Sequence, residues 1–355
     1  MKGRHIMPFL RGICDILLIL SVLHLKKRED MIQLSILLTQ HYRLLSLVAI
    51  IDVFETVNRF FTEESKEKAF EINLIGMTEQ PDLPDNFKKY SYSTFTEIQE
   101  KQDILFIPAF GSENMEQTIA SNECFMSFIV RQHTLGAAIV SLCTGSFLLA
   151  AAGLLNGREA TTHIEASDRF AHSFPEVRLQ PHAIVTHCNN IYTSGGATSS
   201  FHMKLFLIQQ YCGREMAVRI AKTFAIDMNR NNQLYFEHFK PELANNDNLV
   251  KDVQMIINKE YADLKNIEEA LERIPSSRRN IIRRFKQSTG MTPIRYLQKT
   301  KIEAAKKLLE NSDKDIMEVM LSSGYNDLKN FRQLFKSFTG LTPKAYRDKY
   351  GMRLN

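Results

Sequence analysis

One cysteine lies where a β-prone apolar segment changes directly into a helical pattern. Residues 137–141 read as a strand, Cys143 and Thr144 follow it, and a helix is expected from residue 145 onward. Such an elbow exposes a side chain at a helix N-terminus, where the helix dipole lowers a thiol pKa and creates a nucleophile. His163, twenty residues later, is a possible base. The alternative is a buried structural cysteine beside an unrelated histidine.

A second group of informative residues lies near the C-terminus, where one pattern occurs twice. Residues 285–296 recur as 335–346, with Phe, Lys, Thr, Gly, Thr, Pro and Tyr at a constant offset of fifty. Chance is a poor explanation for this agreement, so two copies of one supersecondary unit are predicted. In each copy a glycine (Gly290, Gly340) ends one helix, and a Thr-Pro pair caps and starts the next.

A polar helix is predicted before each of these glycines. In the first copy it begins at Ser277, and Arg279 and Arg283 share one face. In the second copy Asn326 or Asp327 caps it, and its outward side chains are Lys329, Asn330, Arg332 and Gln333. The side chains of Arg, Asn and Gln have the hydrogen-bonding geometry that matches base edges in the major groove.

Another helical segment precedes each polar helix, at residues 267–273 and 316–325. Helix, short turn and polar second helix form the helix-turn-helix arrangement, in which the second helix enters the major groove. The alternative is a helical bundle with a basic solvent face.

The charge distribution favours DNA binding. The chain carries +5 overall, but residues 230–355 hold 24 Lys and Arg against 16 Asp and Glu, a net of +8, and the remainder is at −3. A basic third joined to a slightly acidic remainder fits a polyanion-binding module attached to a domain that binds no polyanion.

The elements that position these residues fall into two domains. From residue 31 to about 211, short strand-like runs alternate with helical runs, which predicts a parallel sheet covered by helices. The expected strands are 32–38, 70–75, 104–108, 137–141, 183–186 and 191–194, and the expected helices are 45–61, 122–133, 145–152, 164–170 and 197–211.

A helix near 215–228 and an Asn-rich linker follow, and beyond residue 249 only helical spacing is present. The predicted boundaries are 31–213 for the α/β domain, 214–248 for the helix and linker, and 249–355 for an all-α domain.

Residues 1–30 and the cysteines bear on the compartment. The apolar run at 16–25 contains His24, lacks a cleavage site and is too short to span a bilayer. We interpret residues 1–30 as an N-terminal extension or as translation from a mis-assigned start, with Met31 the true one. The five widely spaced cysteines include no C-x-x-C pair, which indicates reduced thiols in a cytoplasm and no disulfide framework or metal site.

Residues 249–350 resemble the AraC-family DNA-binding domain. The resemblance rests on the repeated F-K, T-G and T-P segments and on the linking helix that begins at Pro293. It implies two helix-turn-helix units on duplex DNA. It also places Arg279, Ile282 and Arg283 of the first unit, and Asp327, Lys329, Asn330, Arg332 and Gln333 of the second, at the DNA-reading positions.

Residues 31–211 are similar to the PfpI-like, glutamine-amidotransferase-like superfamily, through the segment from Leu142 to His163 and the later Ser194-Gly195-Gly196. This resemblance implies a flavodoxin-like parallel sheet with helices on both faces. Enzymatic relatives carry a carboxylate near the cysteine, and the corresponding residue here is Ser46. Without that acid the Cys143–His163 pair lacks the partner that nucleophilic catalysis uses.

Together the two resemblances indicate a GlxA-type transcription regulator rather than an enzyme. We expect a small effector, implied to be a nitrogenous metabolite, at Cys143, Thr144 and His163, with no metal or cofactor. The expected partners are double-stranded DNA, RNA polymerase and a second copy in a homodimer, with no membrane. An active cysteine-dependent hydrolase, amidase or glyoxalase-like enzyme carrying a DNA-binding domain is the alternative, and a redox sensor using Cys143 is a third possibility.

Overall fold

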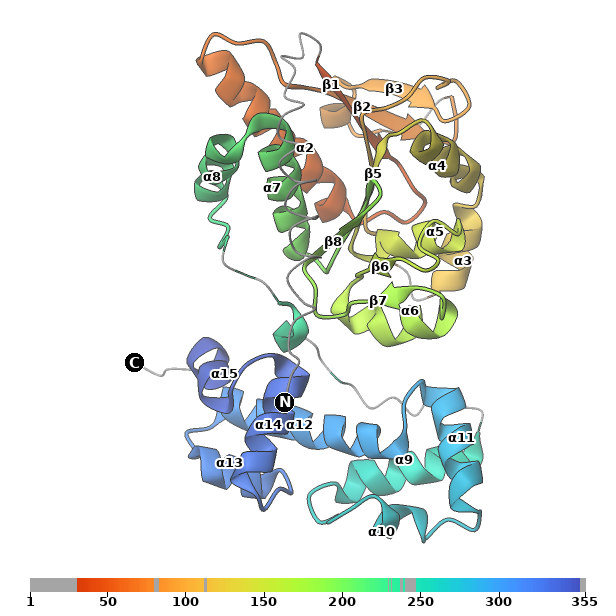
Figure 1. The fold of residues 1–355 in the computed structure, drawn as a ribbon, viewed down its shortest axis with the longest axis vertical. Helices are drawn as coiled ribbons and strands as arrows, with labels where there is room; N and C mark the ends of the chain where they lie inside the picture. Colours follow the sequence, from red (N-terminus) through yellow and green to blue (C-terminus); the bar gives the residue numbers. More distant parts are fainter. Residues whose placement is uncertain are drawn as a thin grey trace, which may run out of the picture.

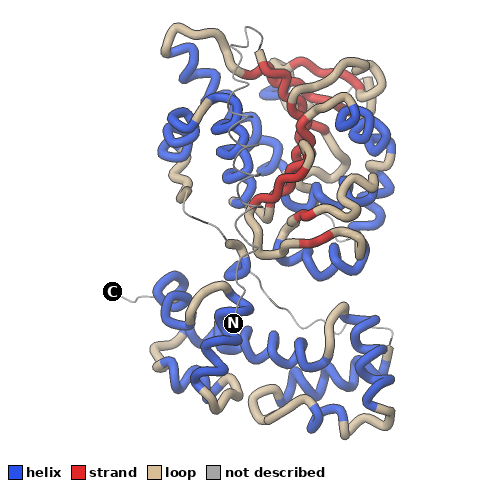
Figure 2. The backbone as a smooth tube through the Cα atoms, in the orientation of Figure 1, coloured by secondary structure: helices blue, strands red, loops and turns tan. Residues whose placement is uncertain are grey.

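The structure is a computed structural model that describes residues 31–79, 83–111, 114–228, 230, 232–236, 239 and 247–351. The N-terminal extension expected at 1–30 lies outside these residues. An α/β part and an all-α part follow each other along the chain (Figure 1). Strands occur only in the first part of the described chain (Figure 2).

A seven-stranded sheet organises the α/β part. Its strand order is β3-β2-β1-β4-β5-β9-β8, and every neighbouring pair is parallel except β8 with β9. The strands are β1 (Ile32–Leu37), β2 (Phe70–Gly76), β3 (Ser91–Thr94), β4 (Ile104–Ile107), β5 (Ala138–Leu142), β8 (Val185–Cys188) and β9 (Ile191–Ser194). The predicted parallel sheet is confirmed. The edge strand β3 and a small sheet of β6 (Glu159–Ala160) and β7 (Arg178–Leu179) were not expected, because these segments have no long apolar run.

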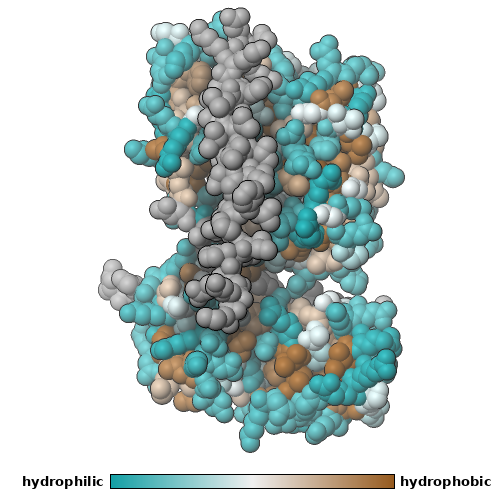
Figure 3. Space-filling model, in the orientation of Figure 1, coloured by the Kyte–Doolittle hydropathy of each residue, from teal (hydrophilic) through white to brown (hydrophobic). Residues whose placement is uncertain are grey.

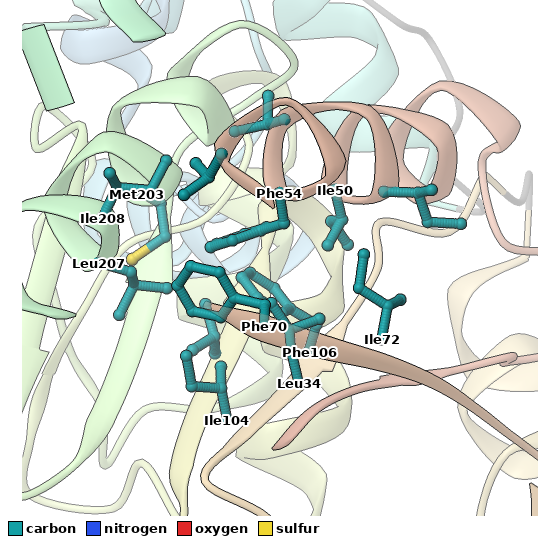
Figure 4. Close-up of a cluster of buried hydrophobic side chains, with 14 of the residues drawn as sticks. Leu34, Ile50, Phe54, Phe70, Ile72, Ile104, Phe106, Met203, Leu207 and Ile208 are labelled. Carbon is teal, nitrogen blue, oxygen red and sulfur yellow. The ribbon is translucent and has the colours of Figure 1, made fainter. Parts of the chain in front are cut away.

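Helices cover both faces of this sheet, as the flavodoxin-like arrangement requires (Figure 1). One face packs against α2 (Leu44–Glu63), α7 (Ser199–Cys212) and α8 (Arg214–Thr223). The other packs against α3 (Met115–Ser121), α4 (Cys124–Thr134), α5 (Ser146–Ala151) and α6 (Ser167–Ser173). In the first core, Phe54 of α2 lies against Phe70 and Phe106 of the sheet, with ring centroids 4.7 and 5.7 Å away (Figure 4). The central strands are buried on both faces, which explains why they read as continuous apolar runs.

The all-α part contains two helical units joined by one long helix. Its helices are α9 (Asn248–Glu260), α10 (Glu268–Leu271), α11 (Arg278–Thr289), α12 (Pro293–Asn311), α13 (Ile316–Ser322), α14 (Leu328–Thr339) and α15 (Pro343–Tyr350). The start of α12 contributes to a core with α9 and α11, and its later turns contribute to a separate core with α13 and α14. Each unit therefore has its own hydrophobic core. The helix near 215–228 is shorter than predicted and ends at Thr223.

No helix in the described ranges has the length and apolar character needed to cross a membrane. On the face drawn in Figure 3 hydrophilic side chains prevail, with smaller hydrophobic patches between them.

Candidate functional site

The elbow at Cys143 is present. Strand β5 ends at Leu142, and Cys143 takes a left-handed backbone conformation with φ of 56° before a single 3-10 turn, Cys143–Gly145, leads into α5. Such a conformation is uncommon for a residue with a side chain. A Cβ at Gly145 would lie 2.8 Å from the carbonyl oxygens of Ile107 and Pro108, so only glycine lets the turn pack this closely on the end of β4.

The thiol itself differs from the prediction. Cys143 is only 5% exposed, and burial raises the pKa of its thiol, although the N–H groups of Ala197 and Thr144 hydrogen-bond to it and work in the opposite direction. Desolvation disfavours the thiolate and outweighs these contacts. The expectation of an exposed cysteine with a lowered pKa is therefore wrong, and the reading of a buried cysteine fits better.

His163 lies in the same neighbourhood but does not pair with the cysteine. The Thr162 hydroxyl donates to the carbonyl oxygen of Cys143 at 3.2 Å, which ties the two segments together. The Nδ1 atom of His163 accepts the N–H of Glu165 at 3.2 Å, and burial lowers the pKa of the imidazole. A neutral ring with this acceptor carries its proton on Nε2. Among the described residues no hydrogen bond joins the imidazole to the Cys143 thiol.

Two hydroxyl groups hold the loop that follows β4. Ser46, at the position where the resemblance places an acid in enzymes, accepts the N–H of Ala109 at 2.9 Å. The Thr144 hydroxyl lies 2.6 Å from the carbonyl oxygen of Phe110 and 3.0 Å from its nitrogen. Ser46 and Thr144 thus bind adjacent residues of one loop, and the fold brings α2 and the elbow together at the carboxyl ends of β1, β4 and β5.

Sequence reasoning missed Arg43, the residue before α2. Its backbone N–H binds Ala109 at 2.7 Å, and its positive charge lowers the pKa of both Cys143 and His163, although less than burial changes them. A Cβ at Gly111 would lie 3.1 Å from Arg43 Nε, which places the guanidinium against the same loop. No local pattern marks this arginine, because the loops meet only through the fold. The described residues contain no group of three His, Cys, Asp or Glu side chains arranged to hold a metal.

The two copies of the C-terminal repeat have the same geometry. Gly290 and Gly340 end α11 and α14 in the left-handed conformation, with φ of 75° and 74°. The ring of Phe285 meets Tyr296 edge-on at 5.4 Å between centroids, and Phe335 meets Tyr346 in the same way at 5.5 Å. Thr292 and Thr342 cap the helices that begin at the two prolines. The predicted internal repeat is confirmed.

The helices α11 and α14 present the predicted polar side chains. Ser277 caps α11 and Asp327 caps α14, each by accepting the backbone N–H three residues later. Exposed side chains on the two helices are Arg279, Arg283, Lys329, Asn330, Arg332 and Gln333, whereas Ile282 is half-buried. The Arg283 guanidinium donates to Asn280 Oδ1 at 3.0 Å and to Gln287 Oε1 at 3.4 Å. Both helices therefore carry an exposed polar face opposite their phenylalanine core.

Known proteins match both parts. The DJ-1/PfpI family matches residues 46–210, and a helix-turn-helix domain family matches residues 272–349. The HTH-type transcriptional regulator CdhR of Pseudomonas aeruginosa is 26% identical over 88% of this chain and 90% of its own length. The regulator GbdR of the same species is 27% identical over 63% of this chain and 61% of its own, and GlxA of Rhizobium meliloti is 25% identical over 62% and 68%.

These matches agree with the architecture and with the repeat. The sheet with its elbow accounts for the first match, and the capped polar helices account for the second. The chain therefore combines a DJ-1/PfpI domain with a helix-turn-helix DNA-binding domain of AraC type, and it is similar over most of its length to HTH-type transcriptional regulators.

Proposed function

We propose that this protein reads specific duplex DNA with α11 and α14 and changes its DNA affinity when a small metabolite binds beside Cys143. The observation that carries the proposal is the repeat: two capped helices with matching Phe–Tyr cores turn the same kind of polar face outward. Two helix-turn-helix units on one linking helix suit two successive major-groove segments.

For the first unit we assign base contacts to Arg279 and Arg283, with Ile282 at the edge of the contact. In the second unit Asn330, Arg332 and Gln333 have the geometry for base edges, and Lys329 suits a phosphate. Asp327 acts first as the cap of α14, where its carboxylate accepts the N–H of Asn330 at 2.8 Å. Its position at the start of the helix brings it close to the groove.

For the effector we assign Cys143, Thr144 and His163, together with Arg43. Hydrogen-bond donors lie in this neighbourhood, namely the Arg43 guanidinium and the imidazole Nε2–H, and the resemblance places Ser46 at the position of an acid in enzymes. This set favours a metabolite with an anionic group, such as the carboxylate of an amino acid or of a quaternary amine acid.

We also propose that the domain performs no catalysis, because a buried thiol with a raised pKa and no paired base is a poor nucleophile. In this proposal the protein acts in the cytoplasm as a homodimer that works with RNA polymerase.

A thermal-shift screen of nitrogenous carboxylates, followed by fluorescence anisotropy on the DNA upstream of the protein's own gene, tests both halves. A ligand that binds only the native state raises its melting temperature. A metabolite that shifts the wild type should lose its effect in Cys143→Phe and keep it in Cys124→Phe, where the cysteine is an exposed residue of α4. If Cys143→Phe responds normally, the effector binds elsewhere. If no upstream fragment binds, the DNA half fails.

A further inference from the structure

Gln233, a residue of the linker between the two domains, is buried in the α/β part. Gln233 is 1% exposed, and its side-chain nitrogen donates to the carbonyl oxygens of Pro181 at 2.9 Å and Thr162 at 3.0 Å. Its side-chain oxygen accepts the N–H of Gly196 at 3.0 Å, and its backbone N–H binds His182 at 3.1 Å. A side chain with this many partners anchors the linker to the first domain.

These partners lie next to His163, one of the residues proposed to bind the effector. Thr162 directly precedes His163 in the chain, and a Cβ at Gly196 would lie 2.3 Å from His163 Cδ2. A Cβ at Gly195 would lie 2.1 Å from Gln233 Oε1. The glycine pair is therefore packed between the histidine and the linker glutamine, with no room for a side chain on either residue. His163, Gly196 and Gln233 thus form one continuous chain of contacts.

The neighbours of Gln233 contact the second helix-turn-helix unit. A short 3-10 turn, η4 (Leu234–Phe236), packs against α14 and lies between the two parts in Figure 1. Leu234 lines a small cavity with Phe338 and Thr339 at the end of α14. Asn232 lies against Gly340, which ends that helix, and the ring of Phe236 meets Tyr350 at 6.4 Å.

We propose that residues 232–236 form a latch that carries the state of the effector pocket to α14, with Gln233 as its positioning residue. This inference rests on the proposed effector site, and it names the segment through which effector binding there reaches the DNA-binding domain. Occupancy that moves His163 or Gly196 breaks the Gln233 contacts, and the freed turn then loosens its hold on the end of α14. The first unit has a core of its own, against which the later linker residue Phe239 packs. In this proposal the turn at 232–236 therefore acts on α14 and not on α11 directly.

Hydrogen–deuterium exchange on the full chain tests the latch without effector or DNA. In Gln233→Ala, exchange should accelerate about tenfold at Gly196 and at the C-terminal end of α14, while α11 stays as in the wild type. Gln132→Ala is the matched control, because Gln132 is also a fully buried glutamine that binds backbone groups, at Gln102 and Glu100, away from the linker. It should leave α14 unchanged.

Gln233→Glu provides a second variant of nearly equal size. It keeps an acceptor for Gly196 but loses the donors to Thr162 and Pro181, so it should loosen α14 as Gln233→Ala does while protecting Gly196 better. Unchanged exchange at α14 in both glutamine variants overturns the latch, as does equal loosening of α14 in Gln132→Ala. Fluorescence anisotropy on the upstream DNA fragment tests the proposed function separately. If the wild type binds no DNA, the proposed function is wrong, whereas the hydrogen–deuterium exchange result still tests the latch.

Discussion

The hydroxyl oxygen of Ser46 lies 2.9 Å from the backbone nitrogen of Ala109 and accepts its N–H. This serine, at the position where the resemblance places an acid in enzymes, satisfies a backbone donor just after β4. The next residue, Phe110, binds the hydroxyl of Thr144. Two neutral hydroxyl groups therefore hold adjacent residues of the loop that follows β4, beside the Cys143 elbow.

Replacing this serine tests its structural role. Ser46→Ala leaves the buried N–H of Ala109 without its partner, which should lower the free energy of unfolding by about 1–3 kcal/mol. Urea denaturation followed by circular dichroism measures the change. Ser337→Ala is the control, because the exposed Ser337 hydroxyl only donates to the carbonyl oxygen of Leu334 within α14. Its loss should have little effect on the free energy of unfolding. Equal stability of Ser46→Ala and the wild type would contradict this role.

The buried thiol should react slowly. Because burial raises the pKa of Cys143, the thiolate is scarce at neutral pH, and the side chain is also shielded. Iodoacetamide labelling followed by peptide mass spectrometry should modify Cys124, which is exposed, well before Cys143. Faster labelling of Cys143 would return the active-enzyme reading to consideration, and turnover on glyoxals or small amides would then be measured.

The cap of α9 should make stability depend on pH. Asp247 accepts the N–H of Val250 and pairs through both oxygens with Arg284, and the guanidinium holds the pKa of its carboxyl below the ordinary value. A lowered folded pKa gives stability that is present above the ordinary pKa and is lost as pH falls through the folded value. Asp247→Asn keeps a cap but loses the charge, so it should be less stable than the wild type near neutral pH.

Melting temperatures of the two proteins should therefore converge only as pH falls below the ordinary Asp pKa of about 3.9. Asp85→Asn is a suitable comparison, since the exposed Asp85–Lys88 pair should contribute little at any pH. A difference between Asp247→Asn and the wild type that stays constant down to acid pH would show that the ion pair does not contribute.

Substitutions of a base-reading arginine and of a phosphate-binding lysine should change DNA affinity in different ways. Arg283→Ala should reduce affinity by about 1–3 kcal/mol at one base position if the guanidinium pairs with guanine, whereas Lys329→Ala should weaken all sequences alike. Arg278→Ala serves as control on the same helix, because its guanidinium is held by both oxygens of Glu268. Anisotropy titrations on a set of single-base variants measure these effects. A uniform loss for Arg283→Ala would reassign that residue to the DNA backbone.

The amino-acid sequence determined the parts of this protein that depend on short-range chemistry. Gly290, Gly340 and the Thr-Pro pairs end and start helices through contacts within a few residues, so their spacing alone predicted the two units and their polar helices. Strands that are buried on both faces could also be predicted, because they have continuous apolar runs. The Cys143 elbow was predicted from an apolar strand that is followed directly by a helical pattern.

Tertiary structure decided what depends on residues far apart in the chain. The burial of Cys143, and with it the direction of its pKa, comes from packing around the elbow that no local pattern records. Arg43 lies beside the elbow because the loops after β1 and β4 meet side by side. Gln233 lies in a polar, Asn-rich segment that reads as an ordinary linker, and only the fold places its amide between Thr162 and Gly196. Solvation and long-range hydrogen bonds are properties of the assembled structure, because their partners become neighbours only when the chain has folded.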